Sequence, residues 1–308
     1  MSVPDAGTTE AGRPEEIKAV PVRRPGRWVA AVVVLAIAAS LVRSAITNPR
    51  FKWHEVGQFL FDTRTLHGVV ATIYLTVLSM LIGIVLGVVL AVMRRSLNPI
   101  VSGASWLYIY IFRGTPVYVQ IVFWYALSAL YPTIDLGIPF GPSFIHLGSN
   151  SVITLLGASL LALGLNEAAY MAEIVRAGII SVSEGQTEAA SSLGMSRLQI
   201  MRLIVLPQAM RVIVPPTGNE TISMLKTTSL VSVIGFAELF YEGSNAYAAD
   251  YQTVQWLIAI SIWYLAMTTV LYVGQYFIER RFGRGFSRAE RATLWGRTLS
   301  LSTGNRPR

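Results

Sequence analysis

The 308-residue sequence contains no cysteine, and its three histidines are far apart. The absence of cysteine excludes disulfides, thiolate metal ligands and cysteine nucleophiles. His54, His67 and His146 do not show the short spacings at which side chains share a metal ion. We therefore expect neither a metal site nor a bound cofactor, and metal-dependent catalysis is not predicted.

Charge is also scarce in this sequence. Charged residues make up 14% of the chain against 53% hydrophobic residues, and the mean hydropathy is +0.52. This composition is typical of an integral membrane protein. The only lysines are Lys18, Lys52 and Lys226, and none lies in a G-x-x-x-x-G-K-[ST] loop that could hold phosphates. The chain is therefore not predicted to be an ATP-hydrolysing enzyme, and any ATP hydrolysis that it depends on would occur on another chain.

About six segments are apolar enough to be predicted as transmembrane helices. They are residues 28–46, 68–93, 117–130, 152–178, 211–237 and 253–278. A signal peptide is the competing interpretation of the first segment, but that apolar run is too long and the Asn-Pro-Arg that follows is a poor cleavage site. Residues 51–65 are expected to form a helix at the outer interface, and residues 100–112 to run along or into the inner one. Residues 131–150 are expected to form a loop.

The distribution of Lys and Arg predicts the orientation of these segments. The stretches assigned to the inside hold 20 of these residues, against three outside, Arg50, Lys52 and Arg64. Basic residues favour the cytoplasmic side, so both termini are predicted in the cytoplasm. The net charge of +8 is then explained by orientation in a lipid membrane, and no nucleic-acid partner is expected. Residues 1–26 are predicted to be a disordered cytoplasmic tail, 27–48 the first transmembrane helix and 284–308 a basic cytoplasmic tail.

A polar segment, residues 188–207, interrupts the apolar pattern with the sequence EAASSLGMSRLQIMRLIVLP. It predicts a short helix over 181–193, a left-handed turn at Gly194 and a second short helix capped by Ser196. That second helix is expected to last until Pro207 interrupts its hydrogen bonds. By the charge distribution this helical pair lies on the cytoplasmic side.

This segment resembles the EAA loop of ABC-importer permeases, and the resemblance extends over about residues 65–283 to permeases for polar amino acids of the histidine, glutamine and arginine type. The matching stretches are 112–116 (FRGTP) with Gln120, 166–173 (NEAAYMAE), 185–190 (GQTEAA), 206–209 (LPQA), 219–220 (NE) and 225–230 (LKTTSL). The resemblance implies an all-α importer transmembrane domain. The helix over 27–48 is additional to the usual five, and the loop over 131–150 looks longer than usual.

The resemblance also implies partners and a coupling site. The partners would be two ATP-binding ABC subunits, an extracytoplasmic solute-binding protein, and a second copy of the permease or a sister permease. Contact with the ATPase would be made by Glu184, Gln186, Glu188, Ala189, Ala190, Gly194 and Pro207.

Charged side chains inside apolar segments are candidates for the substrate path, because each costs roughly 2.5 to 3.5 kcal/mol to insert. Glu167, Glu220 and Lys226, with their neighbours Asn166 and Asn219, form this candidate set. Pairing within the helical bundle is the alternative for each of them. Glu173 and Arg176 are instead expected to pair on one helix, Arg113 to be structural, and Pro215 with Pro216 to free backbone carbonyls beside a polar route.

These features predict the permease subunit of an ATP-driven importer of polar amino acids, located in the bacterial inner membrane and working by alternating access. Carboxylates and a lysine near neutral amides suit a zwitterion better than a sugar, a metal or a lipid. The alternative is an ion-coupled secondary transporter or channel. Such a protein has no need of the cytoplasmic helical pair, and we find no inverted repeat of the kind that is common in secondary transporters.

Overall fold

The computed structural model describes residues 25–138, 141 and 143–282. The predicted tails therefore lie outside the described residues, except for 25 and 26. The chain divides into two units at Phe51. The first contains helix α1 (Pro25–Thr47) and a 3-10 turn (Pro49–Phe51). Its described side chains are exposed apart from half-exposed Ala45 and Phe51, and α1 is long and apolar enough to span a membrane, as predicted.

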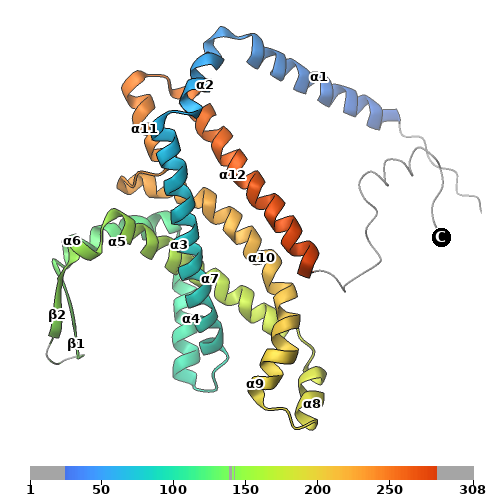
Figure 1. The fold of residues 1–308 in the computed structure, drawn as a ribbon, viewed down its shortest axis with the longest axis vertical. Helices are drawn as coiled ribbons and strands as arrows, with labels where there is room; N and C mark the ends of the chain where they lie inside the picture. Colours follow the sequence, from blue (N-terminus) through green and yellow to red (C-terminus); the bar gives the residue numbers. More distant parts are fainter. Residues whose placement is uncertain (1–24, 139–140, 142, 283–308) are drawn as a thin grey trace, which may run out of the picture. The chain divides into compact units, whose positions relative to one another are not determined.

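The second unit, from Lys52 onward, holds the helices on which the predicted sites lie (Figure 1). They are α2 (Trp53–Leu60), α3 (Thr63–Arg94), α4 (Pro99–Gly114), α5 (Val117–Leu130), α6 (Ser149–Val152), α7 (Leu155–Ile180), α8 (Glu184–Ser192), α9 (Arg197–Ile200), α10 (Leu206–Thr227), α11 (Leu239–Asp250) and α12 (Thr253–Phe282). In the described chain, α1, α3, α7, α12 and the helix that contains α10 are long enough to cross a membrane, and α5 is a shorter apolar helix. The six predicted segments are therefore all helical.

Helices α3 and α7 form the closest long packing in the unit, and small residues make it possible. A Cβ atom on Gly87 would lie 2.5 Å from Met171 Cβ, and one on Gly164 would lie 2.7 Å from Ile82 Cγ2. Gly83 likewise lies against the side chain of Glu167. Gly83 and Gly87 are four residues apart on α3, a spacing of small residues that lets two helices approach closely.

Helix α4 turns back along the end of α3 and packs antiparallel to it. Ser105 Oγ donates to the Leu90 carbonyl at 2.8 Å, and Ser102 Oγ donates to the Arg94 carbonyl at 3.1 Å. Tyr108 donates to the Leu165 carbonyl of α7 at 2.9 Å. Helix α4 therefore contacts two long helices, and the placement of residues 100–112 along or into the inner interface stays a prediction.

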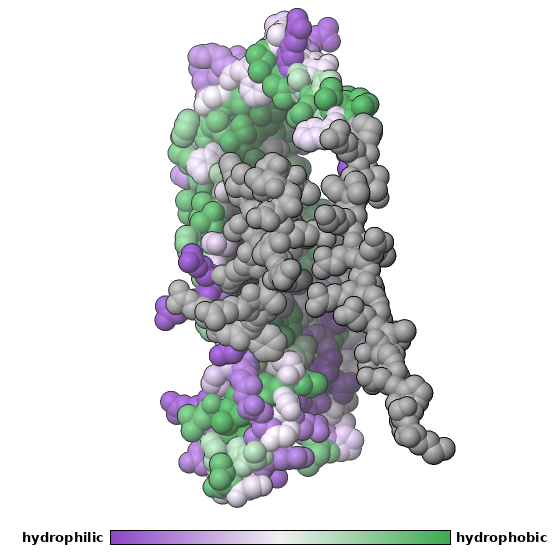
Figure 2. Space-filling view, turned by 90° about the vertical axis from the view of Figure 1, so that its right-hand side faces the viewer, coloured by the Kyte–Doolittle hydropathy of each residue, from purple (hydrophilic) through white to green (hydrophobic). Residues whose placement is uncertain are grey.

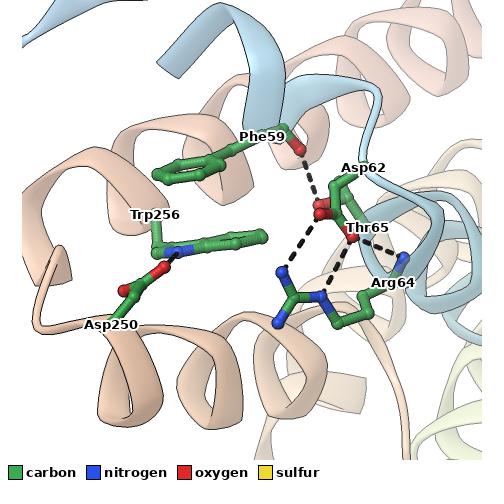
Figure 3. A network of polar contacts seen from close by, with 6 residues as sticks. All are labelled: Phe59, Asp62, Arg64, Thr65, Asp250 and Trp256. Carbon is green, nitrogen blue, oxygen red and sulfur yellow. Dashed lines mark hydrogen bonds and ion pairs between the residues drawn. The ribbon is translucent and has the colours of Figure 1, made fainter. Parts of the chain in front are cut away.

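The other end of the unit, where α2 and α11 lie, is closed by aromatic and ionic contacts (Figures 1 and 3). The rings of Phe59 and Trp256 stack with centroids 4.1 Å apart. The Arg64 guanidinium lies 4.9 Å from the centre of the Trp256 ring and pairs with Asp62 at 3.0 Å. Hydrogen bonds from Arg64 hold the pKa of Asp62 below its usual range. Asp250 accepts the Trp256 indole N–H at 2.8 Å, so α2, α3 and α12 are joined at this end.

A β-hairpin replaces much of the loop predicted over residues 131–150. Strands β1 (Thr133–Gly137) and β2 (Ser143–Gly148) pair antiparallel, with Thr133 opposite Gly148 and an irregularity at Gly137. Asp135 and His146 face each other across the pair at 2.6 Å. The all-α class holds for the bundle, and this two-stranded sheet is an addition that the sequence analysis did not anticipate.

The prediction that the second short helix ends at Pro207 is wrong. Helix α9 passes into a π-helical segment (Met201–Val205) and then into α10, so helical structure is continuous from Arg197 to Ile234. Proline cannot donate the hydrogen bond that an α-helix requires, and its ring clashes with the carbonyl four residues earlier. The wider π turn occurs directly before Pro207, where it relieves that clash.

We expect Gly87→Leu to lower the free energy of unfolding by about 1–3 kcal/mol, because the new side chain would force α3 away from Met171. Thermal unfolding of the full chain in detergent measures the effect. Gly274→Leu is the matched control, since a Cβ atom there meets nothing within 4 Å. Equal destabilisation by both substitutions would show that the α3–α7 contact does not depend on Gly87.

Candidate functional site

The break between α4 and α5 is held open by two amide side chains. Gln120 Nε2 lies 3.0 Å from the Phe112 carbonyl, 3.2 Å from the Thr115 carbonyl and 2.8 Å from Thr115 Oγ1. Asn166, on α7, donates to the same Phe112 carbonyl at 2.8 Å. Backbone groups left without helical partners at the break are thus satisfied by side chains, as a low-dielectric environment requires.

This break forms one wall of a cavity of about 520 Å³, and α7 and α10 form the others. Three of the five predicted path residues line it: Asn166 and Glu167 from α7, and Glu220 from α10. Arg113 and Tyr170 also line it. The structure therefore brings together amides, carboxylates and a guanidinium around one space.

Glu167 is the most enclosed charged group in this cavity wall. Its residue surface is 4% exposed, and its Oε1 atom has no hydrogen-bond partner among the residues that the structure describes. A buried polar atom without a partner is costly, and native proteins rarely leave one unsatisfied. The position suits a carboxylate that accepts a hydrogen bond from a ligand.

The other two predicted path residues do not line this cavity. Asn219 accepts a hydrogen bond from Gln275 Nε2 of α12 at 3.0 Å, so it points to a different neighbour from Glu220. Gln275 also donates to the Pro215 carbonyl at 3.3 Å. Lys226 is exposed. The polar contacts beside the proline pair therefore involve α12.

A structural role was expected for Arg113, but the structure places its side chain beside an aromatic ring and in the walls of cavities. Its guanidinium lies 5.1 Å from the centre of the Tyr170 ring, at a distance that allows a cation–π contact. It lines both the cavity described above and a second one, of about 380 Å³, with Pro216 and Glu220. A charged residue directly before a Gly-Thr-Pro break was the signal for this role. Glu173 and Arg176 form the predicted pair, with an N–O distance of 2.6 Å.

Glu238 is a buried acid that the sequence analysis missed. It caps α11, accepting hydrogen bonds from the backbone N–H groups of Phe240 and Tyr241 at 2.8 Å each. Tyr264 of α12 donates to it at 2.9 Å. Burial raises its pKa despite these donors. Its contacts assign it a structural role, and no local signal marked it because glutamate is not one of the usual N-cap residues Ser, Thr, Asp and Asn.

The helical pair formed by α8 and α9, with the turn between them, is termed the knob here. Gly194 has a φ of +78°, in the left-handed region. Met195 N–H donates to the Ala190 carbonyl and Gly194 N–H to the Ser191 carbonyl, the pattern of a Schellman C-cap. Ser196 and Gln199 form a reciprocal capping box at the start of α9. The predicted glycine turn and serine cap are confirmed.

The surface of the knob mixes polar and apolar side chains (Figure 2, lower end). Leu193 is 83% exposed and Leu198 is 75% exposed, although each is a large apolar residue. Of the predicted coupling residues, Glu184, Gln186, Glu188, Ala189 and Gly194 are exposed and Ala190 is buried. Gln186 accepts a hydrogen bond from Gln208 at 3.0 Å, which ties α8 to α10 one residue after Pro207.

Residues 83–284 match the family of binding-protein-dependent transport system inner membrane components. The chain belongs to this family. It is 47% identical over 299 residues to the arginine transport system permease protein ArgU of Corynebacterium glutamicum, covering 96% of this chain and 90% of the relative. It is 37% identical over 206 residues to the histidine/lysine/arginine/ornithine transport system permease protein HisM of Escherichia coli, covering 66% and 82% respectively.

Solved structures agree with this assignment. The chain superposes on a solved structure titled "Crystal structure of an amino acid ABC transporter with histidines" with a TM-score of 0.60 and a sequence identity of 35%. The superposition covers 71% of this chain and 94% of the chain in that structure. These comparisons identify a membrane component of a transport system. They lend no support to the alternative of an ion-coupled secondary transporter or channel.

We expect Gln120→Leu to destabilise this transport component by about 1–3 kcal/mol, since the Thr115 carbonyl at the break would lose its amide donor. The measurement is thermal unfolding of the full chain in detergent. Ser128→Ala serves as the control, because Ser128 is on the same helix and its hydroxyl bonds only within that helix. Indistinguishable unfolding curves for the two variants would contradict the role given to Gln120.

Proposed function

We propose that the chain is the membrane subunit of an ATP-driven importer of polar amino acids, in which a separate ATPase moves the transmembrane helices through the knob. The names of the relatives support the amino-acid class, since ArgU is named for arginine and HisM for histidine, lysine, arginine and ornithine. The observation that carries the proposal is the continuous helix from the knob to the polar cavity.

This helix begins at Arg197 in the knob and includes Glu220 at the cavity wall. At about 1.5 Å per residue the two points are roughly 35 Å apart along the axis. A continuous helix transmits a displacement of one end to the other. Force applied at the knob would therefore change the position of Glu220 relative to Glu167, which is on α7.

The knob is the proposed docking point for the ATPase subunits. It presents exposed apolar side chains, Leu193 and Leu198, beside exposed acidic Glu184 and Glu188, and such mixed surfaces are typical of protein interfaces. The sequence has no phosphate-binding loop of its own, so ATP hydrolysis belongs to the partner. The opposite end of the unit would face an extracytoplasmic solute-binding protein, and a second permease copy or a sister permease would complete the transmembrane path.

Orientation follows from the same assignment. With the knob on the cytoplasmic side of the bacterial inner membrane, Arg94, Arg95 and Arg176 lie at the inner ends of their helices, in agreement with the positive-inside rule. Both termini are then cytoplasmic.

The cavity is the proposed substrate path. An amino acid brings an ammonium and a carboxylate, and each needs a partner when it leaves water. Glu167 and Glu220 offer acceptors for the ammonium group, and Arg113 offers donors for the carboxylate. Asn166 adds a neutral amide. A cavity with both signs of charge suits a zwitterion better than a sugar.

We expect Gly194→Val to abolish most substrate-stimulated ATP hydrolysis by the assembled transporter, because a β-branched residue is strained at a φ of +78° and would misalign α8 and α9. Gly194→Asn should retain the stimulation, since asparagine tolerates the left-handed conformation. Membrane insertion should be normal for both variants. Full stimulation in the valine variant would contradict docking through the knob.

We expect Glu167→Gln to weaken the apparent affinity of amino-acid uptake about tenfold, as expected for the loss of one charged hydrogen bond, while basal ATP hydrolysis changes less. Glu220→Gln should act in the same direction. Uptake by reconstituted transporter with its binding protein is the measurement. Lys226→Gln is expected to stay within about twofold, because Lys226 is exposed and outside the cavity. An equal loss of apparent affinity in that variant would show that Lys226 belongs to the substrate path.

A further inference from the structure

A third and larger cavity lies where α3 ends beside α4 and α7. Its volume is about 790 Å³, and four arginines line it: Arg94, Arg95, Arg113 and Arg176. Glu173 is the one carboxylate among the lining residues that the structure describes. So strong an excess of one charge around a single space indicates a binding site for an anion.

The charges in this cavity are only partly compensated. Arg176 is neutralised by Glu173 at 2.6 Å. Within the described ranges, none of the other three arginines lies within ion-pair distance of a carboxylate. Arg94 is oriented by a hydrogen bond from its Nη1 to Ser102 Oγ at 3.0 Å, and Arg113 by the Tyr170 ring. Because Arg113 also lines the proposed substrate path, Arg94 and Arg95 are the guanidiniums of this cavity that remain available to an anion.

The rim of the cavity is aromatic. Trp106 and Tyr110 of α4 line it and stack on each other, with ring centroids 5.4 Å apart and an angle of 13° between the planes. They are 50% and 65% exposed, respectively. Tryptophan and tyrosine with one wet edge and one apolar face are typical of the boundary between lipid headgroups and acyl chains. Ile180, also exposed, adds to the apolar lining.

We infer that this cavity binds the phosphate group of an anionic phospholipid in the cytoplasmic leaflet. Guanidinium groups recognise phosphate through paired N–H donors, and basic pockets between helices on the cytoplasmic side bind lipid headgroups. The aromatic rim favours a lipid over free phosphate, because it offers a surface for acyl chains next to the arginines. The inference rests on the orientation proposed above but not on the identity of the transported solute.

The test uses the full chain in vesicles of phosphatidylcholine that contain either brominated phosphatidylglycerol or brominated phosphatidylcholine. Bromine quenches nearby tryptophan fluorescence, and the contribution of Trp106 is the difference between the wild-type protein and Trp106→Phe. We expect Trp106 to be quenched more strongly by the anionic lipid than by the zwitterionic one. The preference should fall about 25-fold in the double variant Arg94→Gln/Arg95→Gln, at about fivefold for each cation removed.

Two matched variants keep the result interpretable. Arg197→Gln/Arg202→Gln removes the same charge from the same side of the protein but outside this cavity, and it should retain the preference. Arg94→Lys/Arg95→Lys preserves the charge and should retain most of it, which excludes misfolding as the cause. A preference that falls equally in the Arg197/Arg202 variant would show general surface attraction and overturn the site.

Two competition experiments distinguish between a lipid headgroup, free phosphate and the transported solute as the ligand of this cavity. Millimolar inorganic phosphate should leave the quenching by phosphatidylglycerol unchanged if the acyl chains contribute to binding. Relief of quenching by phosphate would retain an anion site but overturn its assignment to lipid. Relief by a zwitterionic or cationic amino acid would assign the cavity to the transported solute and overturn the inference, while leaving the proposed function intact.

Discussion

Close contact between α3 and α7 is the constraint on which the rest of the second unit depends. In a lipid environment apolar surface gains little from leaving the solvent, so helices associate through tight van der Waals packing and hydrogen bonds. The glycines at 83, 87 and 164 allow that packing here. Because Gly83 lies directly against Glu167, the same contact fixes where the buried carboxylate points. Helix α7 forms one wall of the cavity, and α10 and the break between α4 and α5 form the others. The position of α7 therefore determines the shape of the cavity.

The second constraint is the unbroken helix from Arg197 to Ile234. Three prolines lie within it, at 207, 215 and 216, and each removes a backbone donor. The π segment before Pro207 accommodates the first of these prolines, and Gln275 of α12 donates to the carbonyl of Pro215. As a result, the knob and Glu220 in the cavity wall belong to one element. The coupling proposed above would therefore pass from the knob to the cavity along a single helix.

Local signals in the sequence were sufficient for much of this structure. Gly194 and Ser196 predicted a turn and a cap because each acts through its own backbone or its nearest neighbours. The continuity through Pro207 could not be foreseen, since a π turn is a compromise between the ring of one proline and the packing of the whole helix. The strand pairing of the hairpin at 133–148 could not be predicted, because a stretch that contains Pro and Gly is typical of a loop.

The direction in which side chains point was a further feature that the sequence could not predict. Asn219 and Glu220 are adjacent, yet one bonds to α12 and the other lines the cavity. Charge in a transmembrane segment indicates that a residue matters, but only the packing of neighbouring helices decides which way it faces. Arg113 shows the converse, because a residue expected to support a chain break also lines three cavities.

The two caps that join α8 to α9 have a consequence for recognition. Met195 and Gly194 satisfy the end of one helix and Ser196 with Gln199 satisfies the start of the next, so the turn is complete without any outside partner. A surface that is already in its bound shape does not lose conformational entropy when it is engaged. If the knob is the docking point proposed above, attachment and release need no rearrangement of this turn, because its conformation is already fixed when the chain folds.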